Sequence, residues 1–281
     1  MSNNKDKFYL SFSAIETFNT CQRKYYYNYL AKLPKVPRAW LTFGNFNHLV
    51  LEKFHNYILF YKKRLRPYEK KALMKRAFFS AIRKSIRLAN AGKDLSMTAD
   101  QIEASKKLLN RYFQRIETNE PDVVYNEKYF EIDLGEGICL RGFMDRVDKV
   151  SEKKFKITDY KTSKAAFAID KNDQLAIYAI GLRKVLNAED VEIYKQLDFL
   201  KVGKLVPDGD NGLLHDASKD EALLAKLLEI GKKIRAKIET DKQEGDWQWT
   251  ENSFCWCCDF QQACLRSRNK NNVHSGEFEF A

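Results

Sequence analysis

Two groups of residues in this sequence could do chemistry, and the denser group lies in the stretch FCWCCDFQQAC at residues 254–264. This stretch holds four of the chain's six cysteines, in the spacing Cys255-x2-Cys258-x5-Cys264. Thiols stay reduced in the cytoplasm, so clustered cysteines there are more often metal ligands or redox groups than disulfides. On spacing alone, a zinc site with four thiolate ligands is favoured over an iron–sulfur cluster.

The second group combines two carboxylates with a lysine. Asp145 lies in GFMDRVD, at the end of one expected strand, and ITDYKT on the next strand carries Asp159 and Lys161. Because side chains alternate along a strand, Asp159 and Lys161 share one face, whereas Tyr160 points to the other. Such carboxylates suit Mg²⁺ or Mn²⁺, and the lysine could position or deprotonate a water for phosphodiester hydrolysis. A surface ion pair is the alternative that the D-x-K spacing alone favours.

The periodicity of apolar residues predicts the elements that position both groups. Helices are expected over 14–30, 44–63, 68–90, 98–117, 172–186 and 219–239. Strands are expected over 123–134, 138–150, 154–162 and 191–202, with turns at 135–137 and 151–154. Ser11 or Ser13 could cap the first helix, and Glu16 would complete a capping box with Ser13. Three meandering strands, a helix and a further strand predict an α/β fold around a mixed sheet.

The charge of the chain points to a polyanionic partner. It has 49 basic and 38 acidic residues, a formal net charge of +11, and the excess is concentrated at 61–87 and 265–272. Binding nucleic acid would release counterions from its phosphates, whereas a solvated basic surface is the alternative. No apolar stretch is long enough to span a membrane and no secretory signal is recognisable, so we expect a cytoplasmic protein. No phosphate-binding loop of an ATP-driven motor is present either.

In their order along the chain, these segments resemble the PD-(D/E)XK nuclease superfamily, specifically its RecB-like branch with an iron–sulfur cluster. That branch includes nuclease domains of bacterial recombination enzymes, phage exonucleases and CRISPR adaptation nucleases. Residues 10–30 resemble its opening helix with a single cysteine, and FGNFNHLVLE resembles its G-x-x-x-H motif. GFMDRVD matches G-x-x-D-R-x-D, with Met144 in place of the superfamily's proline, and DQLAIYA resembles the Q-L-x-x-Y-A helix.

The resemblance implies one nuclease domain over 1–281: a helical part (1–120), a restriction-endonuclease-like sheet core (121–205), and a C-terminal helix with the cluster-binding segment (206–281). It implies that metal is bound by His48, Asp145, Asp159 and the Tyr160 carbonyl. It implies that the catalytic side chains are Lys161, Asp145, Asp159, Gln174 and Tyr178. Lys161 would act directly, while Gln174 and Tyr178, one helical turn apart, would orient the site or the DNA. Glu127 resembles a further acidic position of some members.

Each of these assignments has a structural alternative. His48 could be a packing residue, and His55, about two helical turns on, competes with it for a metal role. Asp148 competes with Asp145, although it would face the opposite side of a regular strand. Gln174 and Tyr178 could be ordinary helix residues.

For the cysteines, the resemblance reverses the preference and implies a [4Fe–4S] cluster held by Cys21, Cys255, Cys258 and Cys264. The cluster would clip the C-terminal segment to the first helix, which is a structural role. Cys257 is an alternative to its neighbour Cys258, whereas Cys139 lies in an apolar strand and is expected to be buried.

The function that follows is a Mg²⁺- or Mn²⁺-dependent DNA nuclease, expected to be an exonuclease on single-stranded ends or overhangs. The strand would be tracked by lysines and its bases stacked on aromatic side chains, among which Tyr25 to Tyr27 could instead be core residues. One alternative is a non-catalytic DNA-binding subunit of a recombination or CRISPR-adaptation complex. Another is an enzyme that acts on RNA.

Overall fold

The chain forms two compact units in a computed structural model that describes residues 7–36, 39–61, 67–90, 97–169, 173–209 and 211–273. The central unit comprises Arg38–Ile132 and Arg141–Leu223. The terminal unit comprises Met1–Pro37, Asp133–Leu140 and Leu224–Ala281. None of the helices in the described ranges combines the length and apolar character needed to cross a membrane.

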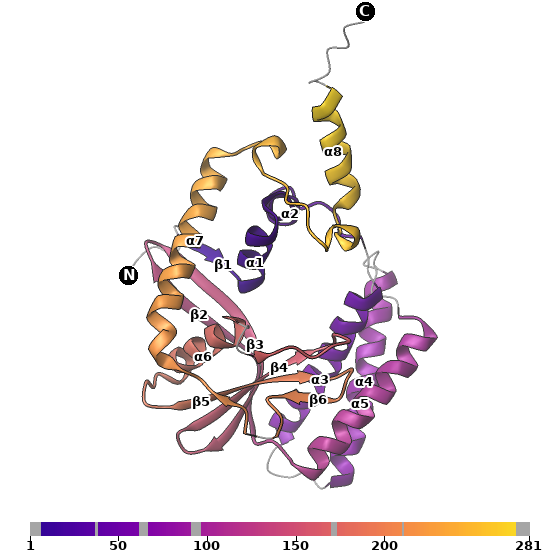
Figure 1. The fold of residues 1–281 in the computed structure, drawn as a ribbon. Helices are drawn as coiled ribbons and strands as arrows, with labels where there is room; N and C mark the ends of the chain where they lie inside the picture. Colours follow the sequence, from indigo (N-terminus) through magenta and orange to yellow (C-terminus); the bar gives the residue numbers. More distant parts are fainter. Residues whose placement is uncertain are drawn as a thin grey trace, which may run out of the picture. The chain divides into compact units, whose positions relative to one another are not determined.

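Three helices form the helical part of the central unit and run next to one another (Figure 1). They are α3 (Ala39–Tyr61), α4 (Pro67–Asn90) and α5 (Ala99–Thr118), close to the ranges that the sequence predicts. Thr98 caps α5 in a reciprocal capping box with Gln101. The helices share a buried apolar core that includes Phe46, Val50, Leu51, Phe54, Leu73, Ala77, Ala81, Leu108 and Leu109. Packing of this core, more than helix propensity, stabilises the three helices.

A seven-stranded mixed sheet lies beside these helices, as the sequence predicts. Its main path is β1 (Phe8–Leu10), β3 (Ile138–Ser151), β4 (Lys154–Lys161), β5 (Glu192–Phe199) and β6 (Lys204–Val206), while β2 (Val123–Gly135) pairs with β3 and β7 (Leu213–Leu214) with β5. Strands β3 and β4 are antiparallel, whereas β4 and β5 are parallel and connected through α6 (Asp173–Leu186). The short strands β1, β6 and β7 carry too few residues to show the alternation that revealed the others.

Two glycines bring α6 close to the sheet. A Cβ atom at Gly181 of α6 would lie 2.6 Å from the ring of Phe130 on β2, and one at Gly142 of β3 would lie 3.0 Å from the same ring. The Phe130 ring also meets the Tyr178 ring edge to face, with 5.6 Å between centroids. The absence of side chains at both glycines therefore sets the position of α6 and of the polar residues on it.

After β1, the terminal unit has helical segments at Phe12–Thr20, Gln22–Tyr25 and Tyr26–Leu30, the last a π-helix, where the sequence predicts one helix. Ser11 caps α1 (Phe12–Thr20) by accepting from the Ala14 N–H, so the alternative box of Ser13 with Glu16 is not used. Cys21 is extended (φ −164°, ψ 112°) and separates α1 from α2 (Gln22–Tyr25). The Arg23 N–H donates to the Gln248 carbonyl (2.8 Å), so a chain segment remote in sequence takes the bond that a continuous helix would have used.

Aromatic residues fill the core of the terminal unit. Trp247 is fully buried and stacks on Tyr25, with 5.8 Å between ring centroids and 14° between ring planes. Tyr25 and Tyr27 are 3% and 2% exposed, so both are core residues and neither presents a face to a base. The C-terminal part of the unit contains α7 (Asp220–Thr240), short 3₁₀ turns at Glu244–Asp246 and Cys255–Cys257, and α8 (Gln261–Val273).

Candidate active site

Three side chains from three elements of the central unit converge on one point. His48 of α3, Glu127 of β2 and Asp145 of β3 each offer one ligand atom, and these atoms all lie within 4.8 Å of one another. His48 Nδ1 is 3.5 Å from Asp145 Oδ2. The Tyr160 N–H of β4 donates to the same carboxylate oxygen (2.8 Å), which fixes the carboxylate against the neighbouring strand.

Gly44 explains how α3 reaches this point. A Cβ atom at Gly44 would lie 2.9 Å from Thr162 Oγ1, immediately after β4. A larger residue would therefore force either the Thr162 side chain or α3 to shift. His48 follows one helical turn later and faces Asp145. The G-x-x-x-H motif thus places its glycine where α3 approaches the end of β4 and its histidine, one turn on, at the position of a ligand.

A chain of polar contacts runs beside the three ligands. Lys161 Nζ is 2.7 Å from Asp159 Oδ2 and donates to Gln174 Oε1 at 3.1 Å. Gln174 Nε2 in turn donates to the Tyr178 hydroxyl at 2.7 Å. The lysine is thus held by a carboxylate on its own strand and by an amide on α6, the helix that the glycines place close to the sheet.

Burial and mutual repulsion perturb the carboxyl groups. Burial, followed by the charge of Asp159, raises the pKa of Asp145 to about 6. Burial, followed by the charge of Asp145, raises the pKa of Glu127 to about 8. A divalent cation would offset this repulsion, and carboxylate oxygens with one imidazole nitrogen are donors that suit Mg²⁺ and especially Mn²⁺. The residues therefore fit a divalent metal.

The same pKa shifts predict how stability depends on pH in metal-free protein. Glu127 has an ordinary pKa of 4.5 and a folded value of about 8, so between these values the folded chain holds a proton that the unfolded chain has released. Stability should therefore fall as pH rises through this window. We expect the metal-free Tm to drop by several degrees from pH 5 to pH 8 beyond the drop of Glu127→Gln, measured by calorimetry.

Mg²⁺ supplies the control for this prediction. Since metal competes with protons for the same carboxylates, it should raise the Tm of the wild type more at pH 8 than at pH 5. An equal increase at both values would contradict the assignment of Glu127 to this site.

A second polar network lies on the opposite face of β3 and β4. It contains Asp148 and His55, the sequence-based alternatives to Asp145 and His48 as metal ligands. Arg146 donates to the hydroxyls of Tyr112 (2.7 Å) and Tyr160 (2.9 Å), and its Nε is 2.9 Å from Asp148 Oδ1. His55 Nε2 is 2.6 Å from the Tyr112 hydroxyl. Burial, with the nearby charge of Arg146, lowers the pKa of His55 well below its ordinary value. Asp148 and His55 thus face away from the acidic residues.

This network gives the strands under the site a fixed register. Removing one partner of a buried ion pair such as Arg146 with Asp148 typically costs about 3–5 kcal/mol, because the other charge stays buried. Tyr160 connects the two faces, since its side chain joins the network while its N–H holds Asp145.

Most residues proposed from the sequence lie together, with one change of emphasis. The tight set contains Glu127 in place of Asp159, whose carboxylate contacts Lys161. Glu127 has a left-handed backbone (φ 48°) inside β2, a conformation that costs free energy for a non-glycine residue and redirects its side chain. Strand alternation does not reveal such a residue. The metal-binding role of the Tyr160 carbonyl stays a prediction.

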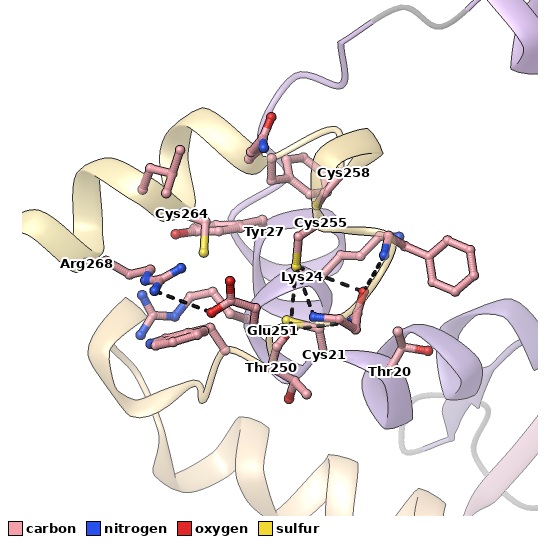
Figure 2. Close-up of a pocket in the computed structure, with 17 residues that line it drawn as sticks. Thr20, Cys21, Lys24, Tyr27, Thr250, Glu251, Cys255, Cys258, Cys264 and Arg268 are labelled. Atoms are coloured by element: carbon pink, nitrogen blue, oxygen red, sulfur yellow. Dashed lines mark hydrogen bonds and ion pairs between the residues drawn. The ribbon is translucent and has the colours of Figure 1, made fainter.

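The four cysteines suggested by the resemblance surround a cavity in the terminal unit (Figure 2). Its volume is about 150 Å³, and its lining includes Cys21 from the N-terminal segment together with Cys255, Cys258 and Cys264 from the C-terminal segment. Cys257 is absent from this lining, and its Sγ is 3.2 Å from the Phe254 carbonyl. Cys139 is fully buried in β3, as expected.

The sulfur positions bear on which inorganic group these cysteines could hold. Four thiolates bound to Zn²⁺ at about 2.3 Å bring their sulfur atoms to about 3.8 Å from one another. In the described ranges, no three cysteine sulfurs lie within 4.8 Å of each other. A cavity of about 150 Å³ has room for several atoms, since one water occupies about 30 Å³. Four thiols from two chain segments around a cavity of this size are a donor set that suits a four-thiolate zinc ion or an iron–sulfur cluster.

Comparison with known proteins identifies the class to which this fold and site belong. The family model of the PD-(D/E)XK nuclease superfamily matches residues 9–265, and the chain belongs to this superfamily. The expected family and its mixed α/β fold are thereby confirmed.

The relatives are longer proteins. Over 71 residues, the chain is 35% identical to an ATP-dependent helicase/deoxyribonuclease subunit of Streptococcus mutans serotype c, covering 24% of this chain and 7% of the relative. Over 191 residues it is 26% identical to the protein of the same name from Streptococcus pyogenes serotype M49, covering 63% of this chain and 16% of the relative. The chain thus spans a small part of these relatives.

A solved structure shares the fold over most of the chain. It is the crystal structure of a candidate exonuclease from Eubacterium rectale, with a TM-score of 0.53 and 10% sequence identity. The match covers 94% of this chain and 90% of the other.

Proposed function

We propose that this chain is a metal-dependent DNA exonuclease that hydrolyses phosphodiesters at single-stranded ends. The observation that carries this proposal is the convergence of His48, Glu127 and Asp145 beside a lysine held by Asp159 and Gln174. The net charge of +11 favours a polyanionic substrate, and the relatives are named deoxyribonuclease subunits. We place the protein in the cytoplasm, with DNA as its partner.

The residues divide the work of hydrolysis. His48, Glu127, Asp145 and Asp159 would hold Mg²⁺ or Mn²⁺, which when bound polarises the scissile phosphate and stabilises the charge that develops on it. The Lys161 ammonium would orient the attacking water and stabilise the negative charge that develops on the phosphate, while the proton of the water passes to solvent. Gln174, which accepts from Lys161 at 3.1 Å, keeps the lysine aimed at the substrate, and Tyr178 keeps Gln174 in place. Gln174 and Tyr178 are therefore positioning residues.

We also propose that Cys21, Cys255, Cys258 and Cys264 hold a [4Fe–4S] cluster with a structural role. The cavity that these four cysteines line supports it. The cluster would join the first helices to the segment before α8, two parts of the terminal unit that are distant in sequence.

The decisive test is digestion of end-labelled single- and double-stranded DNA by anaerobically purified protein. Cleavage should require Mg²⁺ or Mn²⁺, stop with EDTA and prefer single-stranded ends, and the position of the label gives the polarity. Asp145→Asn should bind DNA and fail to cleave it. Equal cleavage in EDTA would refute the metal-dependent mechanism, and equal-length RNA tests the alternative substrate.

A second candidate is a non-catalytic DNA-binding subunit of a recombination or CRISPR-adaptation complex. The relatives favour it, because each is named as a subunit of a helicase-nuclease. The intact set of Asp145, Asp159 and Lys161 opposes it, since a site without selection for cleavage would be free to lose one of them. Tight DNA binding with no cleavage under any metal would make it the better assignment.

A further inference from the structure

Helix α4 carries a row of basic side chains on its solvent-exposed surface. Lys71, Lys75, Phe79, Arg83 and Arg87 recur every four residues, so they form an oblique ridge that winds by about 160° around the exposed half of the helix. All five are exposed, and Phe79 is 55% exposed. We call these five residues the α4 ridge. With a rise of 1.5 Å per residue, it extends for about 24 Å.

The opposite surface of α4 is already occupied by packing. Leu73, Met74, Ala77, Phe78 and Ala81 are buried in the apolar core that α4 shares with α3 and α5. Within the α4 ridge, the Phe79 ring meets the ring of the core residue Phe78 edge to face, with 5.9 Å between centroids, while all five ridge residues remain exposed. The basic charge of the ridge therefore has two possible explanations, a solvated surface or a charged partner.

The basic residues of the α4 ridge lie on a helix with little acidic charge of its own. Glu69, in the first turn, is the one acidic residue in the sequence of α4. Within the described part of the chain, none of Lys71, Lys75, Arg83 and Arg87 has an ion-pair partner. Like charges four residues apart on a helix destabilise it. A ligand that brings negative charges at regular intervals would relieve this repulsion at both ends of the ridge.

We propose that the α4 ridge binds the phosphate backbone of single-stranded DNA, with Phe79 stacking on a base at its centre. This inference rests on the proposed function and adds a binding surface outside the catalytic residues. Cations tracking the backbone, combined with an exposed aromatic ring, are the elements that bind single strands without sequence preference. Since α4 packs against α3, which carries His48, the helical part that binds the DNA strand also contributes a residue to the active site.

An anionic membrane is the other polyanion that a basic helix can bind, and the ridge fits it poorly. Among the α4 side chains that the structure describes, the exposed large apolar ones are Phe79 within the ridge and Ile86 beside it, 55% and 54% exposed. An interfacial helix inserts a broad apolar face between lipids. In α4 that face is buried in the protein core.

The experiment measures the dissociation constant for a single-stranded 30-mer between 50 and 200 mM salt, with EDTA to prevent cleavage. Each phosphate that a protein neutralises on single-stranded DNA adds about 0.7 to the slope of log K against log salt. The double variants Lys71→Ala/Lys75→Ala and Arg83→Ala/Arg87→Ala should each lower this slope by about 1.4. Phe79→Ala should weaken binding about fivefold or more and leave the slope unchanged.

The matched control is Lys149→Ala/Lys204→Ala, which removes two exposed lysines from the sheet of the same unit. It should keep the wild-type slope. Ridge variants with the slope of this control would overturn the proposal, as would variants that lose binding to phosphatidylserine vesicles while keeping their affinity for DNA. Because binding is measured without cleavage, the result is independent of the nuclease assay. Ridge variants of an active enzyme should show a raised KM with an unchanged kcat.

Discussion

Lys161→Ala is expected to lower the rate of DNA cleavage by about 10³-fold, within the range that a positioned proton-transfer group or charge-stabilising donor supplies. Two side chains hold the Lys161 ammonium in place: Asp159 at 2.7 Å and Gln174 at 3.1 Å. Losing it removes the group that holds the attacking water, while the ligand atoms of His48, Glu127 and Asp145 remain. Metal affinity should therefore change far less than the rate, which single-turnover kinetics at saturating DNA and titration calorimetry with Mn²⁺ would show.

Lys164→Ala is the matched control, because Lys164 is exposed and lies three residues further along the chain. It should cleave at the wild-type rate. Gln174→Ala should fall between the two and shift the pH–rate profile, because it frees the lysine without removing it. If Lys161→Ala loses DNA affinity and keeps its rate of cleavage once bound, Lys161 is a binding residue and the proposed mechanism is wrong.

The arrangement of Asp145, Asp159 and Lys161 could be predicted because strands have a period of two. Alternation places Asp159 and Lys161 on one face and Tyr160 on the other. The structure shows Tyr160 in the network of Arg146 and Tyr112, on the side away from Lys161. The same alternation predicts that Asp148 and Asp145 point to opposite faces of β3. In the structure, Asp148 is paired with Arg146, so this buried carboxylate has a partner other than a metal.

Glu127 and the break at Cys21 could not be predicted in this way, because both depend on residues distant in sequence. Glu127 reaches the site through a backbone with φ of 48°, which no local pattern encodes. At Cys21, helical periodicity continues through the residue, but the carbonyl of Gln248 takes the N–H of Arg23. Periodicity reports which residues face a core. It does not indicate where a backbone segment distant in sequence competes for a hydrogen bond.

That break has a consequence for the cysteine site. An extended residue between two helices projects its side chain away from both helical surfaces, and Cys21 lies on the lining of the cavity that also contains Cys255, Cys258 and Cys264. The Arg23 side chain strengthens the same junction, since its Nε donates to the Trp247 carbonyl at 2.6 Å. The protein thus aligns the two segments with its own hydrogen bonds, and an inorganic group would complete the connection.

Cys258→Ser is therefore expected to abolish the cluster and to unfold or loosen the terminal unit, whereas Cys257→Ser should leave both unchanged. The two residues are neighbours in sequence, yet only Cys258 lines the cavity, while the Cys257 sulfur faces the Phe254 carbonyl. Cluster binding supplies folding free energy because the site is not formed in the unfolded chain. The expected loss of stability is large, and protease sensitivity of the segment around α8 would report it.

Iron analysis and visible absorbance of anaerobic protein should give about four irons per chain for the wild type and for Cys257→Ser, and close to none for Cys258→Ser. One zinc per chain in the wild type would replace the cluster with a zinc site, and a cluster lost from Cys257→Ser instead would reverse the ligand assignment.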